Sequence, residues 1–277
     1  MITERIYLKE QFPALGKDEC NAYVDYYIPS AYGKEREDLR DKKHPCMVVC
    51  PGGGYNYTSD RESEPVAMHF AAEGYRVAVV RYSCAPHCFP QQLLEVAGAL
   101  ELIYEHAEEW RIDTSRIAII GFSAGGHLAA QYSNRYNCEE VRAIFPESKG
   151  VQACVLSYPV ITDTTPTHGG TVRNFVGHEP IERNEKGCSC ECIVSDQTPP
   201  TFLWHTSEDG AVPVRNSLLY AQALSEHKIP FEMHIYPYGT HGLSVVNPVV
   251  GNYTDEKVLR VCKWLVEAKS WLKMMGI

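Results

Sequence analysis

Residues 116–127 hold a serine in the setting that a nucleophile needs. Residues 116–120 form a short apolar run rich in isoleucine, which predicts a buried strand. The motif Gly-Phe-Ser-Ala-Gly follows at once, with Ser123 at its centre, and the residues from His127 onward predict a helix. A sharp turn between strand and helix would expose the Ser123 hydroxyl at a helix N-terminus, where negative charge is stabilised. This context favours a nucleophilic serine over a chance occurrence of the motif in a glycine-rich turn.

A serine hydroxyl is a weak nucleophile unless a histidine takes its proton and a carboxylate orients that histidine. After a strand–turn–helix unit of this kind, the acid and then the histidine are expected later in the chain, each just past a strand. Asp209 follows the apolar run 201–206 and stands four residues before Pro213, in the common D-x-x-V-P arrangement. We therefore favour Asp209 as the acid, with Glu208, one residue earlier, as the alternative.

His241 is the strongest candidate for the base among the 11 histidines of the chain. It lies in the sequence Gly-Thr-His-Gly after the apolar run 231–236, which is the last predicted strand. Two other histidines near the motifs, His127 and His205, are expected to pack in the interior, because they lie on a predicted helix and at the end of a predicted strand. The sequence thus predicts a catalytic triad of Ser123, His241 and Asp209.

Three consecutive glycines, Gly52 to Gly54, follow the apolar run 46–50. Glycine backbone can turn its N–H groups inward without a side-chain clash. The N–H groups of Gly53 and Gly54, with that of Ala124 just after the nucleophile, are therefore predicted to form an oxyanion hole. A phosphate-binding loop is the alternative, but no Gly-Lys-Ser/Thr ending follows the glycines.

The residues after the glycines are aromatic and polar. Tyr55, Tyr57 and Arg61, together with Glu62, are candidates for lining the pocket where the alcohol part of a substrate would bind. Ordinary loop packing and capping of the next helix would explain the same residue types.

Strand and helix patterns alternate from residue 46 onward, which predicts an α/β fold with a mostly parallel sheet covered by helices on both faces. Residues 3–8 and 22–28 are expected to be antiparallel edge strands, and 33–45 a charged loop. We expect residues 1–277 to form a single domain, with 162–200 as a short, irregular cap or rim insertion. The other expected strands are 46–50, 75–82, 116–120, 151–158, 201–206 and 231–236, and the expected helices are 63–73, 91–110, the residues from 127 on, 215–227 and 255–273.

The composition argues against several classes of partner. The net charge is −9 and no basic run is present, so nucleic acid and anionic membrane surfaces are not expected as partners. Residues 1–11 lack the apolar core of a signal peptide, and no stretch reaches the roughly 20 apolar residues of a membrane span, so a cytoplasmic location is expected. The 11 cysteines are scattered, which favours free thiols. A C-x-C-x-C cluster, formed by Cys188, Cys190 and Cys192, lacks the second half of a zinc site, so we predict no metal and no cofactor.

Together these motifs resemble the α/β-hydrolase superfamily, over about residues 45–270. More narrowly, they resemble the small esterase/lipase group related to hormone-sensitive lipase and to bacterial carbohydrate acetyl esterases. Pro51 stands where that group usually has a histidine before the glycines, and Phe122 where the lipase branch commonly has aspartate. Both departures favour the carbohydrate-esterase branch, and the long N-terminal helical cap of the group has no counterpart here.

The resemblance implies an α/β-hydrolase fold and a serine ester hydrolase that acts through an acyl-enzyme without a cofactor. We expect short acyl esters, acetyl above butyryl, of a sugar or oligosaccharide. The alternatives are a general cytoplasmic carboxylesterase, a serine peptidase-like hydrolase, or a binding protein of the same fold. Whether the chain forms a homo-oligomer is left open.

Overall fold

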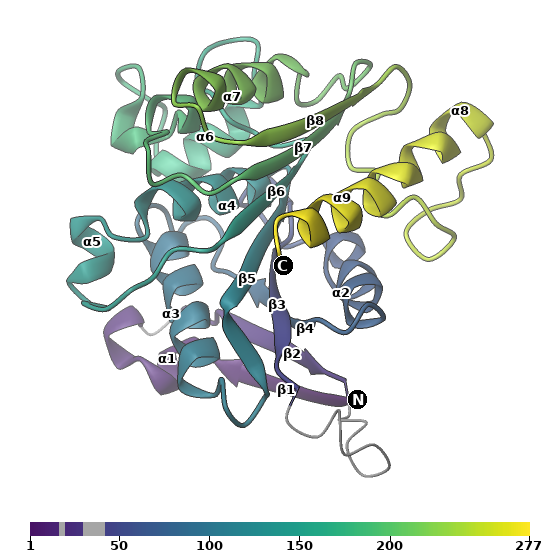
Figure 1. Cartoon of the computed structure of the whole chain (residues 1–277). Coiled ribbons are helices and arrows are strands. Elements are labelled where there is room, and N and C mark those ends of the chain that lie inside the picture. The colour runs from purple at the N-terminus through teal and green to yellow at the C-terminus, as the bar shows by residue number, and fades with distance from the viewer. Residues whose placement is uncertain (17–19, 30–41) are drawn as a thin grey trace.

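An eight-stranded sheet forms the centre of the computed structural model, which describes residues 1–16, 20–29 and 42–277. The strand order is β1-β2-β4-β3-β5-β6-β7-β8, parallel from β4 to β8 and antiparallel where β1 and β2 join (Figure 1). The expected charged loop lies mostly outside the described residues. The strands are β1 (Ile2–Tyr7), β2 (Tyr23–Ile28), β3 (His44–Cys50), β4 (Arg76–Arg81), β5 (Ile112–Phe122), β6 (Ala153–Ser157), β7 (Thr201–Thr206) and β8 (Phe231–Tyr236).

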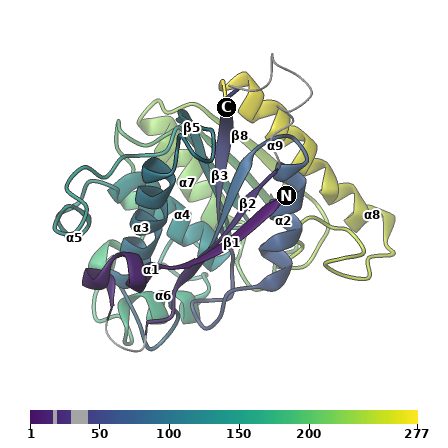
Figure 2. The ribbon, with the colours of Figure 1, turned by 90° about the horizontal axis from the view of Figure 1, so that it is seen from below.

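Helices cover both faces of this sheet, as the alternating pattern predicted (Figures 1 and 2). Neighbouring strand residues point to opposite faces, so Val48 packs in one buried cluster and Val49 in the other. One face is covered by α3 (Gln91–Glu105), α4 (Ala124–Arg135) and α7 (Arg215–Glu226), and the other by α2 (Glu64–Ala71) and α9 (Lys263–Met274). The remaining helices are α1 (Leu8–Gln11), α5 (Glu139–Arg142), α6 (Gly169–Val176) and α8 (Glu256–Leu259).

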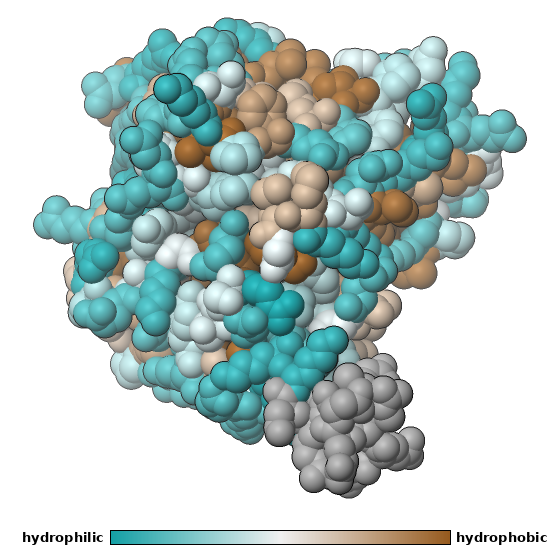
Figure 3. Space-filling view, in the orientation of Figure 1, coloured by the Kyte–Doolittle hydropathy of each residue, from teal (hydrophilic) through white to brown (hydrophobic). Residues whose placement is uncertain are grey.

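On the face shown in Figure 3, hydrophilic residues are widespread and the apolar patches are interrupted by polar side chains. Within the described part of the chain, no helix has the length and apolar character needed to cross a membrane.

Several elements differ from expectation, among them β5, which was expected over 116–120 and spans Ile112–Phe122. The helix predicted over 91–110 ends at Glu105, because the chain turns there and Arg111 adopts a left-handed φ of 54°. The final helix is divided into α8 and α9 by a 3₁₀ turn at Arg260–Cys262. The segment 162–200, predicted to be irregular, contains α6, whose two initial glycines have low helix propensity and hid it from the sequence pattern.

Backbone segments approach each other closely at the turn from β5 into α4. Ser123 has φ 53° and ψ −117°, a conformation that side-chain-bearing residues rarely adopt. A Cβ atom at Gly121 would lie 2.1 Å from the Gly125 carbonyl oxygen, and one at Gly125 would lie 2.1 Å from the Cys50 oxygen. The glycines before and after Ser123 are therefore required for strand and helix to meet.

His127 joins α4 to the rim segment 162–200. Its Nε2 lies 2.7 Å from the Cys188 carbonyl oxygen and its Nδ1 lies 2.9 Å from the Tyr55 hydroxyl. The neutral tautomer with the proton on Nε2 satisfies both contacts, by donating to Cys188 and accepting from Tyr55. Burial lowers the pKa of His127 to about 4, so the imidazole stays neutral at neutral pH. The prediction that His127 packs in the interior is confirmed.

We expect Gly121→Ala to lower the free energy of unfolding by about 1–3 kcal/mol or more, because the new methyl group would overlap the Gly125 carbonyl. Urea denaturation measures the loss. Gly210→Ala is the matched control, since a Cβ atom there meets open space. Equal denaturation midpoints for the two variants would contradict the steric account.

We expect His127 to make unfolding pH-dependent. A histidine whose folded pKa is about 4 contributes stability that is complete above its unfolded pKa of ~6.5 and is lost as the pH falls toward 4. The loss is up to ~3 kcal/mol, from a shift of about 2.5 pKa units. The stability difference between wild type and His127→Gln should therefore shrink as urea denaturation is repeated from pH 7 to pH 4.5. A constant difference over this range would rule the mechanism out.

Candidate active site

Ser123, His241 and Asp209 lie together at one edge of the sheet. They follow β5, β8 and β7, whose carboxyl ends meet at this edge. The Ser123 Oγ lies 2.8 Å from His241 Nε2, and His241 Nδ1 lies 2.6 Å from Asp209 Oδ2. The structure thus brings together the three residues that the motifs singled out, in the order nucleophile, base and acid.

Asp209 is a buried carboxylate that stays ionised. Its Oδ1 accepts hydrogen bonds from the backbone N–H groups of Ala211 and Val212, at 3.0 and 2.8 Å. Burial alone would raise the pKa of Asp209, but its contacts with His205 and His241 and the N–H of Val212 outweigh burial and hold the pKa well below its ordinary value. A fixed negative charge at this position can hold His241 in one orientation.

Glu208, the alternative acid, lies elsewhere in the loop after β7. Its Oε2 accepts a hydrogen bond from the N–H of Gly239 at 3.2 Å. Asp209, rather than Glu208, contacts His241.

The glycine loop and the start of α4 present N–H groups beside Ser123. Among the hydrogen bonds of the described residues, none has the backbone N–H of Gly53, Gly54 or Ala124 as its donor. Gly53 and Gly54 have φ values of 126° and 64°, and a Cβ atom at Gly53 would lie 2.0 Å from the Tyr57 oxygen. Both glycines line a cavity of 240 Å³ together with Ser123 and His241, which we call the catalytic cavity. These donors are available to an oxygen bound next to Ser123.

Glu62 connects the glycine loop to the loop that carries His241. Its side chain is buried, and its two oxygens accept from the Gly52 N–H at 2.8 Å and from the Tyr158 hydroxyl at 2.6 Å. The Tyr158 oxygen also accepts from the Ser244 N–H at 2.9 Å, and the Tyr158 ring packs edge-on against the His241 imidazole. Glu62 therefore contributes to the position of both loops.

The residues after the glycines separate into two groups. Tyr57 and Arg61 line the catalytic cavity, as expected. Tyr55 does not, and this expectation is corrected: its side chain is fully buried, and its hydroxyl contacts His127. The left-handed turn at Gly54 and Tyr55 directs that ring into the core between Tyr82 and Phe175.

His168 lines the same cavity and was missed by sequence analysis. It is the N-cap of α6, where its Nδ1 lies 3.2 Å from the Thr171 N–H. Burial and the neighbouring His241 lower the pKa of His168, so the ring is neutral, and the bond from Thr171 leaves its proton on Nε2. A histidine in a segment without helical periodicity gave no signal for this position.

No group of three or more histidine, cysteine or acidic side chains among the described residues could hold a metal ion. Within the C-x-C-x-C cluster, Cys188 and Cys190 are buried and Cys192 is exposed. Burial raises the pKa of Cys188 to about 12, so its thiol is protonated.

A family model and two relatives match much of this chain. The BD-FAE family model matches residues 35–224. Endo-1,4-beta-xylanase B of Butyrivibrio fibrisolvens is 35% identical over 88% of this chain, and an acetylxylan esterase of Xylanibacter ruminicola is 29% identical over 71%. The chain spans 40% of the length of each of these two relatives.

Solved structures with the same fold align over nearly the whole chain. An acetyl ester-xyloside bifunctional hydrolase from Caldicellulosiruptor lactoaceticus has a TM-score of 0.83 and 33% identity, over 99% of this chain and 96% of its own. The carboxylesterase Cest-2923 from Lactobacillus plantarum also has a TM-score of 0.83, with 27% identity over 100% and 98% of the two chains. The predicted superfamily and fold class are confirmed. The chain belongs to the BD-FAE family and has the α/β-hydrolase fold.

Proposed function

We propose that the chain is a serine carboxylic-ester hydrolase that removes short acyl groups, acetyl in preference to butyryl, from sugars or oligosaccharides. The observation that carries this proposal is the continuous contact from Ser123 through His241 to Asp209, beside unpaired backbone N–H groups. The names of the acetylxylan esterase and the acetyl ester-xyloside hydrolase support the sugar ester as substrate.

In the proposed reaction, Ser123 Oγ attacks the ester carbonyl while His241 Nε2 takes its proton. Asp209 stabilises the imidazolium that forms. The N–H groups of Gly53, Gly54 and Ala124 hold the negative carbonyl oxygen of the tetrahedral intermediate. His241 then returns the proton to the alcohol oxygen, which leaves an acyl group on Ser123. A water molecule, deprotonated by His241, attacks this acyl-enzyme and releases the acid.

The dimensions of the catalytic cavity support a short acyl group. Its volume of 240 Å³ lies below the ~300–1,000 Å³ of pockets that hold drug-sized ligands. Its lining is largely polar and includes Asn56, Arg61 and His168, which suits the hydroxyl groups of a sugar. A carboxylesterase without sugar preference is the second candidate, favoured by the similarity to the Lactobacillus plantarum carboxylesterase.

We expect the protein to hydrolyse p-nitrophenyl acetate faster than the butyrate and octanoate esters, and to release acetate from acetylated xylo-oligosaccharides. Ser123→Ala should lower kcat on each substrate by roughly 10⁴–10⁶-fold, because the nucleophile is lost. Ser225→Ala, an exposed serine on α7, is the matched control. Optimal activity on the octanoate ester, or no acetate from any acetylated sugar, would refute the sugar assignment. Near-wild-type turnover by Ser123→Ala would refute the mechanism.

Asp209 and Glu208 can be separated by the same assay. Asp209→Asn should lower kcat by roughly 10⁴-fold, because an amide neither fixes the required tautomer of His241 nor stabilises its cation. Glu208→Gln keeps an oxygen that can accept from Gly239, so its kcat should stay within about twofold of wild type. The reverse ranking of the two variants would assign the acid to Glu208.

A further inference from the structure

Tyr57 forms part of the wall of two cavities. One is the catalytic cavity, and the other, which we call the outer cavity, has a volume of 440 Å³. The outer cavity is lined by Tyr57 with Asn21, Tyr23, Arg81, Ser83 and His87, among others. Arg81 ends β4 and pairs with Tyr23, the first residue of antiparallel β2. The outer cavity therefore lies at the same edge of the sheet as Ser123.

The outer cavity suits a neutral polar ligand. No acidic side chain is among the described residues that line it, and its one lysine or arginine, Arg81, is paired with Asp60 at 2.8 Å. The remaining lining offers hydroxyl, amide and imidazole groups next to aromatic rings. Sugars match this combination, because their hydroxyl groups form hydrogen bonds while the C–H faces of their rings pack on aromatic side chains.

Of the three tyrosines in the described lining of the outer cavity, Tyr57 is the most exposed, and Tyr82 is buried. The Tyr57 side chain is 63% exposed. The Tyr23 ring, in contrast, already carries the Arg5 guanidinium at 4.0 Å from its centre. A sugar chain that extends from the catalytic cavity into the outer cavity would pass Tyr57, since this residue lines both cavities.

The backbone around Tyr57 is fixed relative to the glycine loop. The N–H groups of Asn56 and Tyr57 donate to the Gly53 carbonyl at 3.0 and 3.4 Å. On the other side, the Arg81 guanidinium donates to the Thr58 carbonyl at 3.1 Å. The backbone that carries the Tyr57 ring is thus held in a defined position relative to Gly53 before a ligand binds.

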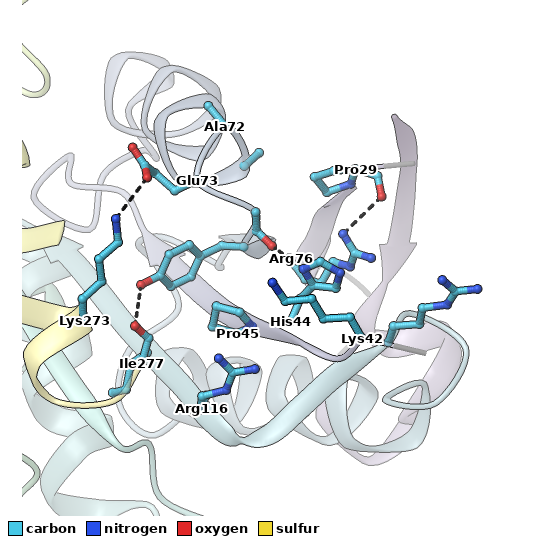
Figure 4. A pocket seen from close by; sticks show the side chains of 14 residues that line it. Pro29, Lys42, His44, Pro45, Ala72, Glu73, Arg76, Arg116, Lys273 and Ile277 are labelled. Atoms are coloured by element: carbon cyan, nitrogen blue, oxygen red, sulfur yellow. Dashed lines mark hydrogen bonds and ion pairs between the residues drawn. The ribbon is translucent and has the colours of Figure 1, made fainter. Parts of the chain in front are cut away.

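Another large cavity, of 430 Å³, differs from the outer cavity in its location and in the charge of its lining (Figure 4). It lies at the opposite edge of the sheet, beside His44 and Arg76 at the amino ends of β3 and β4. Its cationic lining residues are Lys42, Arg76, Arg111, Arg116 and Lys273. A substrate bound at Ser123 cannot extend into it.

We propose that the outer cavity is a sugar-binding subsite, which holds the units of an oligosaccharide next to the unit whose ester is cleaved at Ser123. This inference rests on the proposed function. The catalytic cavity has room for the acyl group and little more than the sugar unit that carries it, so a longer substrate must continue outside. The outer cavity, within the ~300–1,000 Å³ typical of ligand pockets, receives that continuation across Tyr57.

The test compares kcat/KM for acetate release from a xylotetraose acetylated on one terminal unit with that from an acetylated methyl xyloside. The ratio of the two values is taken within one preparation, so the fraction of active enzyme cancels. We expect wild type to favour the tetraose at least tenfold. Tyr57→Ala should reduce the ratio several-fold because it removes the ring on which a sugar can stack. His87→Ala should also reduce it several-fold, because it removes a polar side chain from the lining of the outer cavity. Tyr57→Phe, which keeps the aromatic ring, should retain most of the wild-type preference for the tetraose.

Phe231→Ala is the matched control, a half-exposed aromatic side chain at the amino end of β8 that lines neither cavity. Its ratio should equal that of wild type. Two outcomes would overturn the subsite and leave the proposed function standing. In one, both sugars release acetate and the wild-type ratio is near one. In the other, both sugars release acetate and the ratio is unchanged in Tyr57→Ala and His87→Ala. No acetate from either sugar would overturn both.

Discussion

The backbone conformation of Ser123 is the constraint on which the active site depends. At φ 53° and ψ −117°, the residue reverses the chain between β5 and α4 while its hydroxyl stays at the sheet edge. Three backbone hydrogen bonds hold this conformation: the Ser123 N–H donates to Ser157, and its carbonyl accepts from His127 and Val160. The strain is balanced by packing that only glycine permits at positions 121 and 125. Because β6 and α4 both take part, Ser123 is positioned by the sheet as a whole.

Glu62 holds in place the groups that surround Ser123. Burial and the Glu62 carboxylate raise the pKa of Tyr158, so the phenol keeps its proton and donates to Glu62. The same carboxylate accepts the N–H of Gly52, next to the predicted oxyanion hole. One buried side chain thereby fixes the spacing between the glycine loop and the ring that packs on His241. Loops far apart in the sequence are thus connected through Glu62 and Tyr158.

Ser123, His241 and Asp209 could be singled out from the sequence because each lies in a short motif just after a strand. Parallel strands bring such motifs to one edge, so the contacts of Ser123, His241 and Asp209 follow from the strand assignment. The direction in which a loop side chain points does not follow from the strand assignment. Tyr55 and Tyr57 are two residues apart, yet a left-handed turn buries the first and exposes the second. The sequence pattern carries no information on that turn beyond the glycines themselves.

His168 and α6 show the other limit of the sequence pattern, since they depend on tertiary contacts. The rim segment is fixed by the bond from His127 to the Cys188 carbonyl and by Asn174, whose amide donates to the Gly54 carbonyl at 2.8 Å. This second bond attaches α6 directly to the glycine loop. His168, the N-cap of α6, lines the catalytic cavity, so moving α6 away from this cavity would break the bond to Gly54 and disturb the backbone N–H groups beside Ser123. Because the rim segment is attached to the glycine loop, the size of the catalytic cavity and the geometry of the proposed reaction depend on the same contact.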